Sequence, residues 1–535
     1  MDTQTIYRRR WVILSVLIVG LLAIVIDNTV LNVALKTIAE PRGGLGASQS
    51  QLEWAINSYT LVFAGLLFTF GVIGDKIGRK RMLMIGLALF GIASLLSAYS
   101  RTPEQLIFAR AAMGLGGAAV MPQTLSIISN VFEPAERARA IGLWAMAVGL
   151  GIATGPVLGG VLLDHFWWGS VFLINVPVTV LGAIAAFMLV PESRNTEAGG
   201  IDYLGVLLSI AGLVLLVYGI VQGGDIGSWI HAAVLGPIAG GLAILAAFGW
   251  YETRIAHPSL DVRLFRDHRL SASVGAIALV FFGMGGVFFF TSFYLQNVRG
   301  YTPLAAGLLT VPFAAGQLLF SPRSAGLVRR YGAKAVGATG LFVMAAALAG
   351  YATLGTATPI WLLGVIFAVQ GAAIGAVMPA ATAAVMEVLP RERAGAGSAL
   401  TNIARQVAVA LSVAVLGSIL AEFYRGSLSP ALTHLPAAAR GLASSSITAT
   451  QAVAQQLGPA GRSLLVPAND AFVHAMHATT IVAALMAVAG ALVVVRWMPG
   501  RPRPAASAAR AQDRDYEAEL AIMEEDMLKP AEREV

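Results

Sequence analysis

The stretch Gly71-Val72-Ile73-Gly74-Asp75-Lys76-Ile77-Gly78-Arg79-Lys80-Arg81 packs charge and glycine between two long apolar runs. The run before it, residues 54–73, has about 20 predominantly apolar residues, and as a helix of about 30 Å it crosses the hydrocarbon core of a bilayer. Basic residues directly after such a run are held on the cytoplasmic face. The stretch therefore predicts a membrane protein and gives it an orientation.

The composition of the whole chain also indicates an integral membrane protein. The 535 residues are 57% hydrophobic and only 12% charged, and the mean hydropathy is +0.74. There is no cysteine, which excludes disulfides, thiolate metal sites and cysteine nucleophiles. The net charge of +7 comes from basic residues in short loops, so it indicates topology and not nucleic-acid binding.

Apolar runs of spanning length recur along the chain. Every second loop between them is rich in arginine and lysine, which predicts a multi-pass protein of the cell (inner) membrane with both termini cytoplasmic. The first run follows basic residues but has no signal-peptide cleavage site, so we interpret it as a span. The fourteen expected spans are 11–34, 52–73, 82–99, 104–127, 140–163, 169–190, 203–222, 231–250, 271–294, 303–321, 334–354, 359–386, 396–421 and 472–495.

An internal repeat predicts the architecture. The glycine-rich segment 112–122 and the basic loop 134–138 are echoed at 371–379 and 390–394. Because the two copies lie eight spans apart, the expected fold is all-α, with two six-helix halves and two helices inserted between them. The expected parts are an N-terminal half at 1–199, the inserted helices at 200–256, a C-terminal half at 257–500 with a long outer loop at 422–471, and a cytoplasmic tail at 501–535.

Four motifs carry a family resemblance. Residues 71–80 resemble the G-x-x-x-D-x-x-G-R-K loop of the major facilitator superfamily. Residues 26–35 in the first span, Arg110 in the glycine-rich fourth span, and residues 151–160 in the fifth span are similar to its fourteen-span drug:proton antiporter family. The resemblance implies multidrug efflux and antibiotic resistance. The expected activity is proton-coupled export of lipophilic drugs or toxic metabolites, driven by the proton gradient without a cofactor.

Asp27 and Arg110 are the residues expected to couple proton movement to transport. Ionisable groups inside spans are costly and usually face a cavity or a partner. At 1.5 Å per residue, Asp27 lies roughly 24 Å along the first span and Arg110 roughly 10 Å from the outer surface, so their depths match. An intramembrane acid beside an arginine is a candidate proton relay. The alternative is a permanent ion pair that only fixes helix packing. Phe367 stands at the position of the twelfth span that matches Arg110, so the repeat does not explain Arg110.

The glycines of the 71–81 loop and of the fifth span permit close approach of helices. The resemblance implies that the loop is a conformational latch, with Asp75 engaging the start of the thirteenth span near 394–398. A loop that only anchors topology is the alternative. The latch residues are Gly71, Gly74, Asp75, Gly78, Arg79 and Lys80. The motif of the fifth span implies export and comprises Gly151, Gly155, Pro156, Gly159 and Gly160, although ordinary small-residue packing accounts for part of it.

The substrate cavity is expected between the halves. The thirteenth span lacks the carboxylate found in similar exporters of multivalent cations, so we expect monocationic or neutral amphiphiles to be handled better than dications. The candidate cavity residues are Asn28, Asn32, Asn57, Tyr59, Trp144, Phe282, Tyr294, Asn402 and Gln406.

Several chemistries are not expected. The chain contains no P-loop sequence that would let it energise transport with its own nucleotide site. We expect no catalytic residues, no metal and no cofactor, and we expect a monomer whose partners are a small lipophilic substrate, protons and the bilayer. Two other functions stay open: a dedicated exporter of one endogenous metabolite, antibiotic or lipid, and a membrane sensor or scaffold whose acidic tail, 513–535, binds a partner.

Overall fold

The computed structural model describes residues 3–194, 202–255, 260, 262–388 and 394–498. Within these ranges, fourteen helices are long and apolar enough to cross a membrane, which confirms the expected number of spans. The expected boundaries at 199/200 and 256/257, and the tail at 501–535, lie outside the described residues.

The first half contains six spans, the last of which is broken into two helices. Polar caps and prolines set where several of these helices begin. Ser48 forms a capping box with Gln51, and Pro103 and Pro134 occupy first helical positions, where the missing N–H is not needed. The helices are α1 (Thr3–Ala39), α2 (Gln49–Ile77), α3 (Arg79–Ala98), α4 (Pro103–Val131), α5 (Pro134–His165), α6 (Ser170–Leu173) and α7 (Asn175–Leu189).

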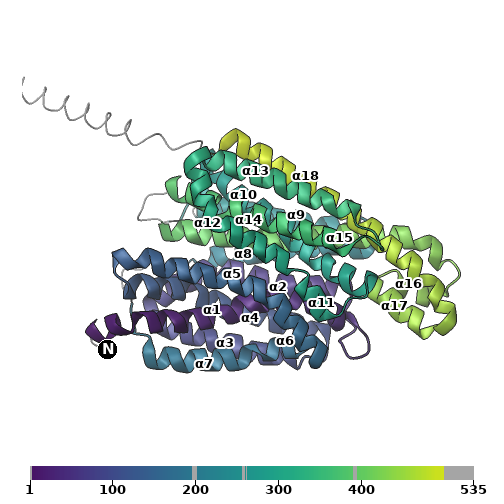
Figure 1. The fold of residues 1–535 in the computed structure, drawn as a ribbon, viewed down its shortest axis with the longest axis horizontal. Helices are drawn as coiled ribbons and strands as arrows, with labels where there is room; N and C mark the ends of the chain where they lie inside the picture. The colour runs from purple at the N-terminus through teal and green to yellow at the C-terminus, as the bar shows by residue number, and fades with distance from the viewer. Residues whose placement is uncertain (1–2, 195–201, 256–259, 261, 389–393, 499–535) are drawn as a thin grey trace, which may run out of the picture.

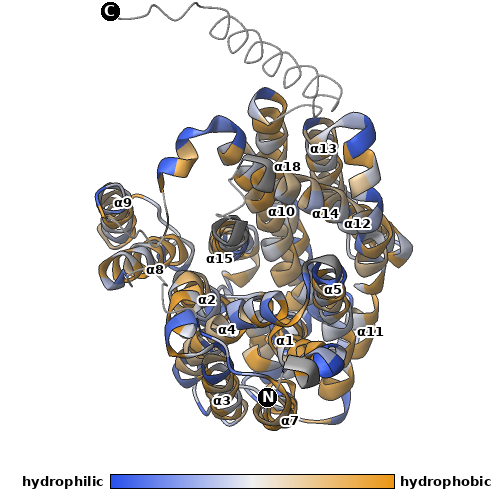
Figure 2. Cartoon of the chain, turned by 90° about the vertical axis from the view of Figure 1, so that its left-hand side faces the viewer, coloured by the Kyte–Doolittle hydropathy of each residue, from blue (hydrophilic) through white to orange (hydrophobic). Residues whose placement is uncertain are grey.

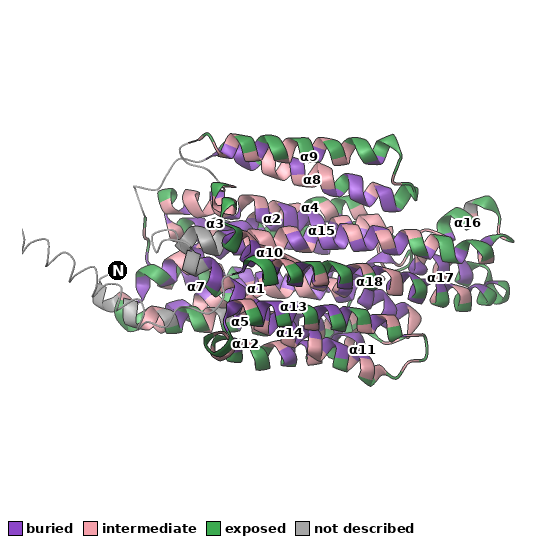
Figure 3. Ribbon diagram, turned by 90° about the horizontal axis from the view of Figure 1, so that it is seen from above, coloured by how far each residue is buried: buried purple, intermediate pink, exposed green. Residues whose placement is uncertain are grey.

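The inserted pair is α8 (Tyr203–Ile226) and α9 (Ala232–Glu252). In Figure 2, seen along the helices, this pair lies beside the bundle. α8 packs against α2 and α15, whereas α9 packs mainly on α8 and is largely exposed (Figure 3). Because the exposed side chains of both helices are largely apolar, they suit contact with lipid.

The second half repeats the six-span plan and adds a helical cap. The π-helical turn η2 prolongs α10 at the end of the bundle where the cap lies. The elements are η1 (Val262–Arg266), α10 (His268–Phe293), η2 (Tyr294–Val298), α11 (Pro303–Leu308), α12 (Val311–Tyr331), α13 (Ala333–Gly350), η3 (Tyr351–Thr353), α14 (Ile360–Val388), α15 (Ala394–Leu428), η5 (Ser429–Leu432), α16 (Ala437–Ala443), α17 (Ile447–Gln456), η6 (Gly458–Leu464) and α18 (Leu465–Trp497).

The structure shortens the loop expected at 422–471. α15 continues to Leu428 and α18 already begins at Leu465. The extra turns form because Tyr424 and Leu428 are buried, and the Tyr424 hydroxyl lies 2.6 Å from Thr450 Oγ1 in α17. The remaining residues, 429–464, fold as short helices at the right-hand end of Figure 1. We call this the cap end, and the opposite end, with the N-terminus and residues 71–81, the loop end.

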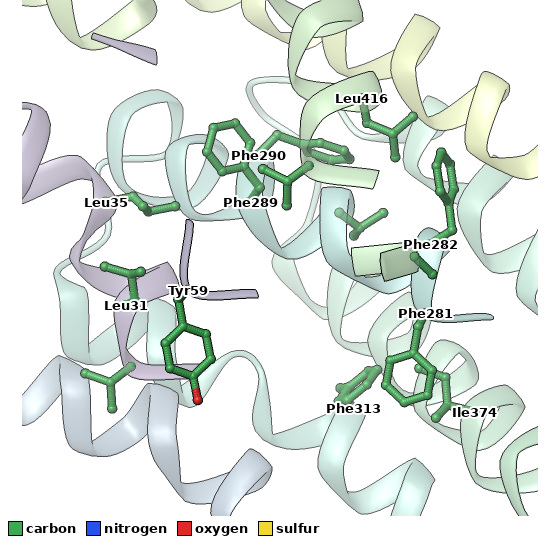
Figure 4. Close-up of a cluster of buried hydrophobic side chains, with 14 of the residues drawn as sticks. Leu31, Leu35, Tyr59, Phe281, Phe282, Phe289, Phe290, Phe313, Ile374 and Leu416 are labelled. Atoms are coloured by element: carbon green, nitrogen blue, oxygen red, sulfur yellow. The ribbon is translucent and has the colours of Figure 1, made fainter. Parts of the chain in front are cut away.

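The two halves share one buried apolar interior. Figure 1 shows the first half below and the second half above, with their helices roughly parallel. Figure 4 shows Tyr59 with Leu31 and Leu35 from the first half, facing an aromatic group from the second half that includes Phe289 and Phe290. This interior holds the candidate site between the halves.

Candidate proton and substrate site

Asp27 and Arg110 form a buried ion pair at the centre of the first half. Each is 1% exposed. Nη1 of Arg110 donates to Oδ2 of Asp27, and Nδ2 of Asn175 donates to Oδ1 at 2.9 Å. The guanidinium also donates from Nε to the carbonyl of Ala55 at 3.1 Å. Since both carboxylate oxygens accept a charged or amide donor, the buried negative charge is fully satisfied.

The ion pair joins four helices of one half. Asp27 comes from α1, Arg110 from α4, Asn175 from the start of α7, and the accepting carbonyl from α2. Aromatic rings cover the guanidinium, with ring centres 4.4 Å away in Tyr59 and 5.8 Å away in Phe172. The expected approach of Asp27 and Arg110 is therefore present in the structure, whereas Asn175 was not anticipated from the sequence. The sequence feature that could have indicated Asn175 is a single amide side chain in an otherwise apolar span.

A cavity of about 130 Å³ lies between the halves, next to this pair. Residues of α1, α2, α4 and α5 line it on one side, and residues of α10 and α15 on the other. Asn28, which follows Asp27 in the chain, lines the cavity and donates from Nδ2 to the Tyr59 hydroxyl at 3.1 Å. Because the Tyr59 ring packs on Arg110, one chain of contacts runs from the cavity to the ion pair.

Three of the nine candidate cavity residues, Asn28, Asn32 and Gln406, line this cavity. Phe281 and Phe288 supply aromatic walls. The other six candidates, Asn57, Tyr59, Trp144, Phe282, Tyr294 and Asn402, are placed outside its lining.

The placement of those other candidates has clear causes. Tyr59 is fully buried against Arg110, and Trp144 donates from Nε1 to Thr124 Oγ1 at 3.0 Å. Tyr294 lies at the cap end, where its hydroxyl donates to the carbonyl of Gly355 at 2.8 Å. Asn57 and Phe282 are buried, and Asn402 lies on α15 with an interaction of its own. Helix rotation thus explains Asn57 and Phe282, which directly follow the lining residues Ile56 and Phe281, whereas Tyr294 is displaced along its helix.

Hydrogen bonds between the halves close the cap end. Lys36 Nζ donates to the carbonyl of Gln296 at 3.1 Å, and Gln296 Nε2 donates to the carbonyl of Val33 at 2.9 Å. Gln49 Nε2 donates to the carbonyl of Gly417 at 2.8 Å. On α1, α10 and α15 these residues lie nearer the cap end than the cavity-lining residues of the same helix. These bonds therefore hold the two halves together on the cap-end side of the cavity.

The glycine face of α5 packs tightly on α1. A Cβ atom at Gly155 would collide with Thr29 Oγ1, and one at Gly151 would lie 2.9 Å from Val25 Cγ1. A Cβ at Gly159 would lie 3.0 Å from Val30 Cγ1. The remaining motif residues face the second half, where Gly160 lies against Leu304 of α11 and Pro156 against Gly307.

The 71–81 loop is held by its own half. Asp75 Oδ1 pairs with Arg79 Nε at 2.7 Å. Gly78 has φ +119°, a conformation that favours glycine, and a Cβ there would lie 2.6 Å from the carboxylate of Glu192. That carboxylate accepts from the backbone N–H of Lys80 at 3.1 Å. Glu192 was not anticipated from the sequence.

The remaining loop glycines explain the close contact with α4. Gly74 lies against the side chain of Gln123, and Gly71 lies against Pro122. The expected contact of Asp75 with residues 394–398 involves side chains that lie outside the described part of the chain. The latch role therefore stays a prediction.

The comparisons with known proteins agree with this architecture. The family model of the Major Facilitator Superfamily matches residues 17–413. Multidrug efflux pump LfrA of Mycolicibacterium smegmatis is 34% identical over 488 residues, which cover 91% of this chain and 96% of LfrA. Multidrug resistance protein Stp of Mycobacterium tuberculosis is 34% identical over 415 residues, which cover 77% of this chain and 76% of Stp.

Solved structures share the fold at low sequence identity. A bacterial homolog to the human lysosomal transporter Spinster, crystallised in an inward-facing and unoccupied conformation, has a TM-score of 0.64 and 18% sequence identity, covering 92% of this chain and 99% of that one. The resemblance inferred from the motifs is confirmed by the family model and by the similarity to LfrA and Stp. This chain is a member of the Major Facilitator Superfamily.

Proposed function

We propose that this protein is a proton-coupled antiporter that exports lipophilic drugs or toxic metabolites from the cytoplasm or the inner leaflet. The observation that carries the proposal is the buried Asp27–Arg110 pair, linked through Tyr59 and Asn28 to a cavity between the halves. The similarity to LfrA, a multidrug efflux pump, and to Stp, a multidrug resistance protein, supports the same substrate class.

The arrangement suits alternating access. Substrate enters the cavity while the cap-end hydrogen bonds hold the outer side closed, and the two halves then rock so that these bonds separate. In the outward-open state Asp27 takes up a proton from the outer water, which weakens its pair with Arg110. On return, the proton leaves Asp27 towards the cytoplasm. The potential favours this inward movement by about 2.3 kcal/mol per 100 mV.

The proposed orientation places the loop end in the cytoplasm. Basic residues cluster at this end, among them Arg8, Arg9 and Arg10 near the N-terminus and those of the stretch Lys76 to Arg81, where α2 ends and α3 begins. The positive-inside rule then puts the cap end outside. With this orientation the present conformation is closed to the outside and corresponds to the substrate-loading state.

The test is drug efflux under an imposed pH gradient. Everted membrane vesicles energised to an acidic interior should accumulate several chemically unrelated fluorescent drugs, and each drug should release part of the stored proton gradient. Loss of the gradient with a protonophore should stop accumulation. Accumulation that persists without a pH gradient would contradict proton coupling, and transport of one compound alone would favour a dedicated exporter.

A further inference from the structure

The cavity between the halves contains an unbalanced positive charge. Arg405 of α15 lines the cavity together with Gln406. Among the described residues that line it, Arg405 is the only charged side chain, because the others are apolar, hydroxyl or amide residues. The deep acid of this protein, Asp27, is outside the lining and already bound to Arg110 and Asn175.

The two arginines of the site differ in burial, since Arg110 is buried and Arg405 is partly exposed, and they also differ in their partners. Arg110 has a carboxylate partner, whereas no described carboxylate forms an ion pair with Arg405. The guanidinium of Arg405 lies 5.5 Å from the ring centre of Phe281. A guanidinium stays charged in proteins and carries only donors, so its strongest partner is an anionic acceptor. The N–H donors of Arg405 thus have no carboxylate partner among the described residues. A substrate can supply one.

The residues around Arg405 indicate which chemical class of substrate could be that partner. Phe281 and Phe288 offer flat apolar walls, and Asn28, Asn32 and Gln406 place amide groups around them. The planar fork of an arginine matches a carboxylate or a similar oxyanion through two parallel hydrogen bonds. A cation placed in the same cavity would meet a like charge with no acid among the described lining residues.

We propose that Arg405 binds the acidic group of an aromatic substrate, so that the cavity prefers amphiphiles bearing a carboxylate or a comparable oxyanion over cations of the same size. This inference rests on the proposed export function and names its substrate class. It keeps the weak handling of dications expected from the sequence. For singly charged substrates, it predicts a preference for anions where the sequence led us to expect cations.

Three probes with one aromatic body test the preference. 1-Pyrenebutyric acid, its amide and 1-pyrenebutylamine carry negative, neutral and positive charge. Binding to the full-length protein in phosphatidylcholine nanodiscs is followed by energy transfer from tryptophan to pyrene. Because charge-assisted bidentate hydrogen bonds are the strong ones, we expect the acid to bind about tenfold more tightly than the amide, and the amine to bind most weakly.

Substitutions of Arg405 locate the effect. Arg405→Gln should remove the advantage of the acid while changing amide affinity by less than about twofold, and Arg405→Lys should keep part of the advantage because it keeps the charge without the fork. Arg425→Gln is the matched control, since Arg425 lies on the same helix but donates to the carbonyls of Gly224 and Asp225 near the cap end. This control should leave the order of the probes unchanged.

Two results would overturn the inference. One is equal or tighter binding of the amine than of the acid to the unaltered protein, which needs no variant to fold. The other is an equal loss of affinity for all three probes in the Arg405→Gln variant. Transport in vesicles separates this inference from the proposed function. Acid binding that depends on Arg405 without any pH-driven export would refute the export function alone. Export of the amide without preferential acid binding would refute the acid preference alone.

Discussion

The two halves of this protein share a backbone plan but place different chemistry at matching positions. Arg110 of α4 corresponds to Phe367 of α14 in the internal repeat. Arg110 pairs with Asp27, whereas Phe367 is fully buried among aromatic rings, with centres 5.8 Å away in Phe288 and 6.3 Å away in Tyr351. The repeat gives the two halves similar backbones, and the ion pair lies in the first half.

The loops that follow the second span of each half show the same contrast. Gly78 and Gly332 both have positive φ, +119° and +86°, and each separates two consecutive helices. In the first half Asp75 pairs with Arg79 across this turn. The corresponding stretch 321–334 is basic and contains no acidic residue. Close helix packing is thus common to both halves, and an acid–base pair at this turn belongs to the first.

The largest expected effect comes from breaking the ion pair. Arg110→Met leaves the Asp27 carboxylate buried without its charged partner, which costs about 3–5 kcal/mol of stability. Phe367→Met, the matched change in the second half, replaces one apolar side chain by another of similar volume and should cost less than about 1.5 kcal/mol. Thermal unfolding in detergent measures both.

A double variant sharpens this comparison. Asp27→Asn combined with Arg110→Met removes both charges, so most of the stability lost in Arg110→Met should return while proton-coupled transport stays absent. Equal destabilisation by Arg110→Met and Phe367→Met would contradict the distinction between an ionic first half and an aromatic second half.

A smaller effect is expected from the glycine face of α5. Counting from the repeated basic loop, Gly155 corresponds to Leu411 of α15, so the second half carries a large side chain where the first half requires none. Gly155→Ala should cost about 1–3 kcal/mol because its Cβ would collide with Thr29. Gly142→Ala on the same helix has no atom within 4 Å of the new Cβ and should be neutral or stabilising by about 0.5–1 kcal/mol.

Unfolding temperatures and efflux rates of the two alanine variants provide the measurement. If Gly155→Ala were as stable and active as Gly142→Ala, close packing of α5 on α1 would not be required.

The smallest expected effect concerns the loop end of the first half. Arg10 binds Glu136 through two hydrogen bonds, at 2.7 and 3.0 Å, and the bond from Arg10 lowers the pKa of Glu136 below its usual value. A lowered folded-state pKa contributes stability that is present above the ordinary carboxyl value of about 4.3 and is lost as the pH falls below it.

The test compares the unaltered protein with Glu136→Gln. The difference in unfolding temperature should be small at pH 7, because the pair lies at the surface and is only partly buried. It should shrink as the pH falls from the ordinary carboxyl value through the lowered pKa of Glu136. A difference that grows on acidification would show that the sign of this linkage is wrong.

Sequence patterns predicted the spans, the repeat and the approach of Asp27 to Arg110, because bilayer thickness fixes helix length and depth along each helix follows from residue count. The partners Asn175 and Glu192 were missed because they lie 148 and 112 residues from the groups they bind, and one polar residue at a helix end has no periodic signal.

The sequence predicted which side chains line the cavity less well than it predicted the depth of residues in the membrane. Asn57 and Phe282 lie on the expected helices, each directly after a lining residue, but are themselves outside the lining. Membrane helices are apolar on all sides, so the hydrophobic pattern that orients a helix in a soluble protein gives little information about rotation. Arg405 could be seen in the sequence, but its lack of a described carboxylate partner is visible only once the helices are packed.

The most direct test of the central claim measures proton uptake per substrate exported in Asp27→Asn. The unaltered protein in sealed vesicles should move protons inward when substrate is exported. The variant should show no substrate-dependent proton movement while still exchanging labelled substrate for unlabelled substrate, which reports a folded and rocking protein. Undiminished proton-coupled efflux from Asp27→Asn would contradict the account.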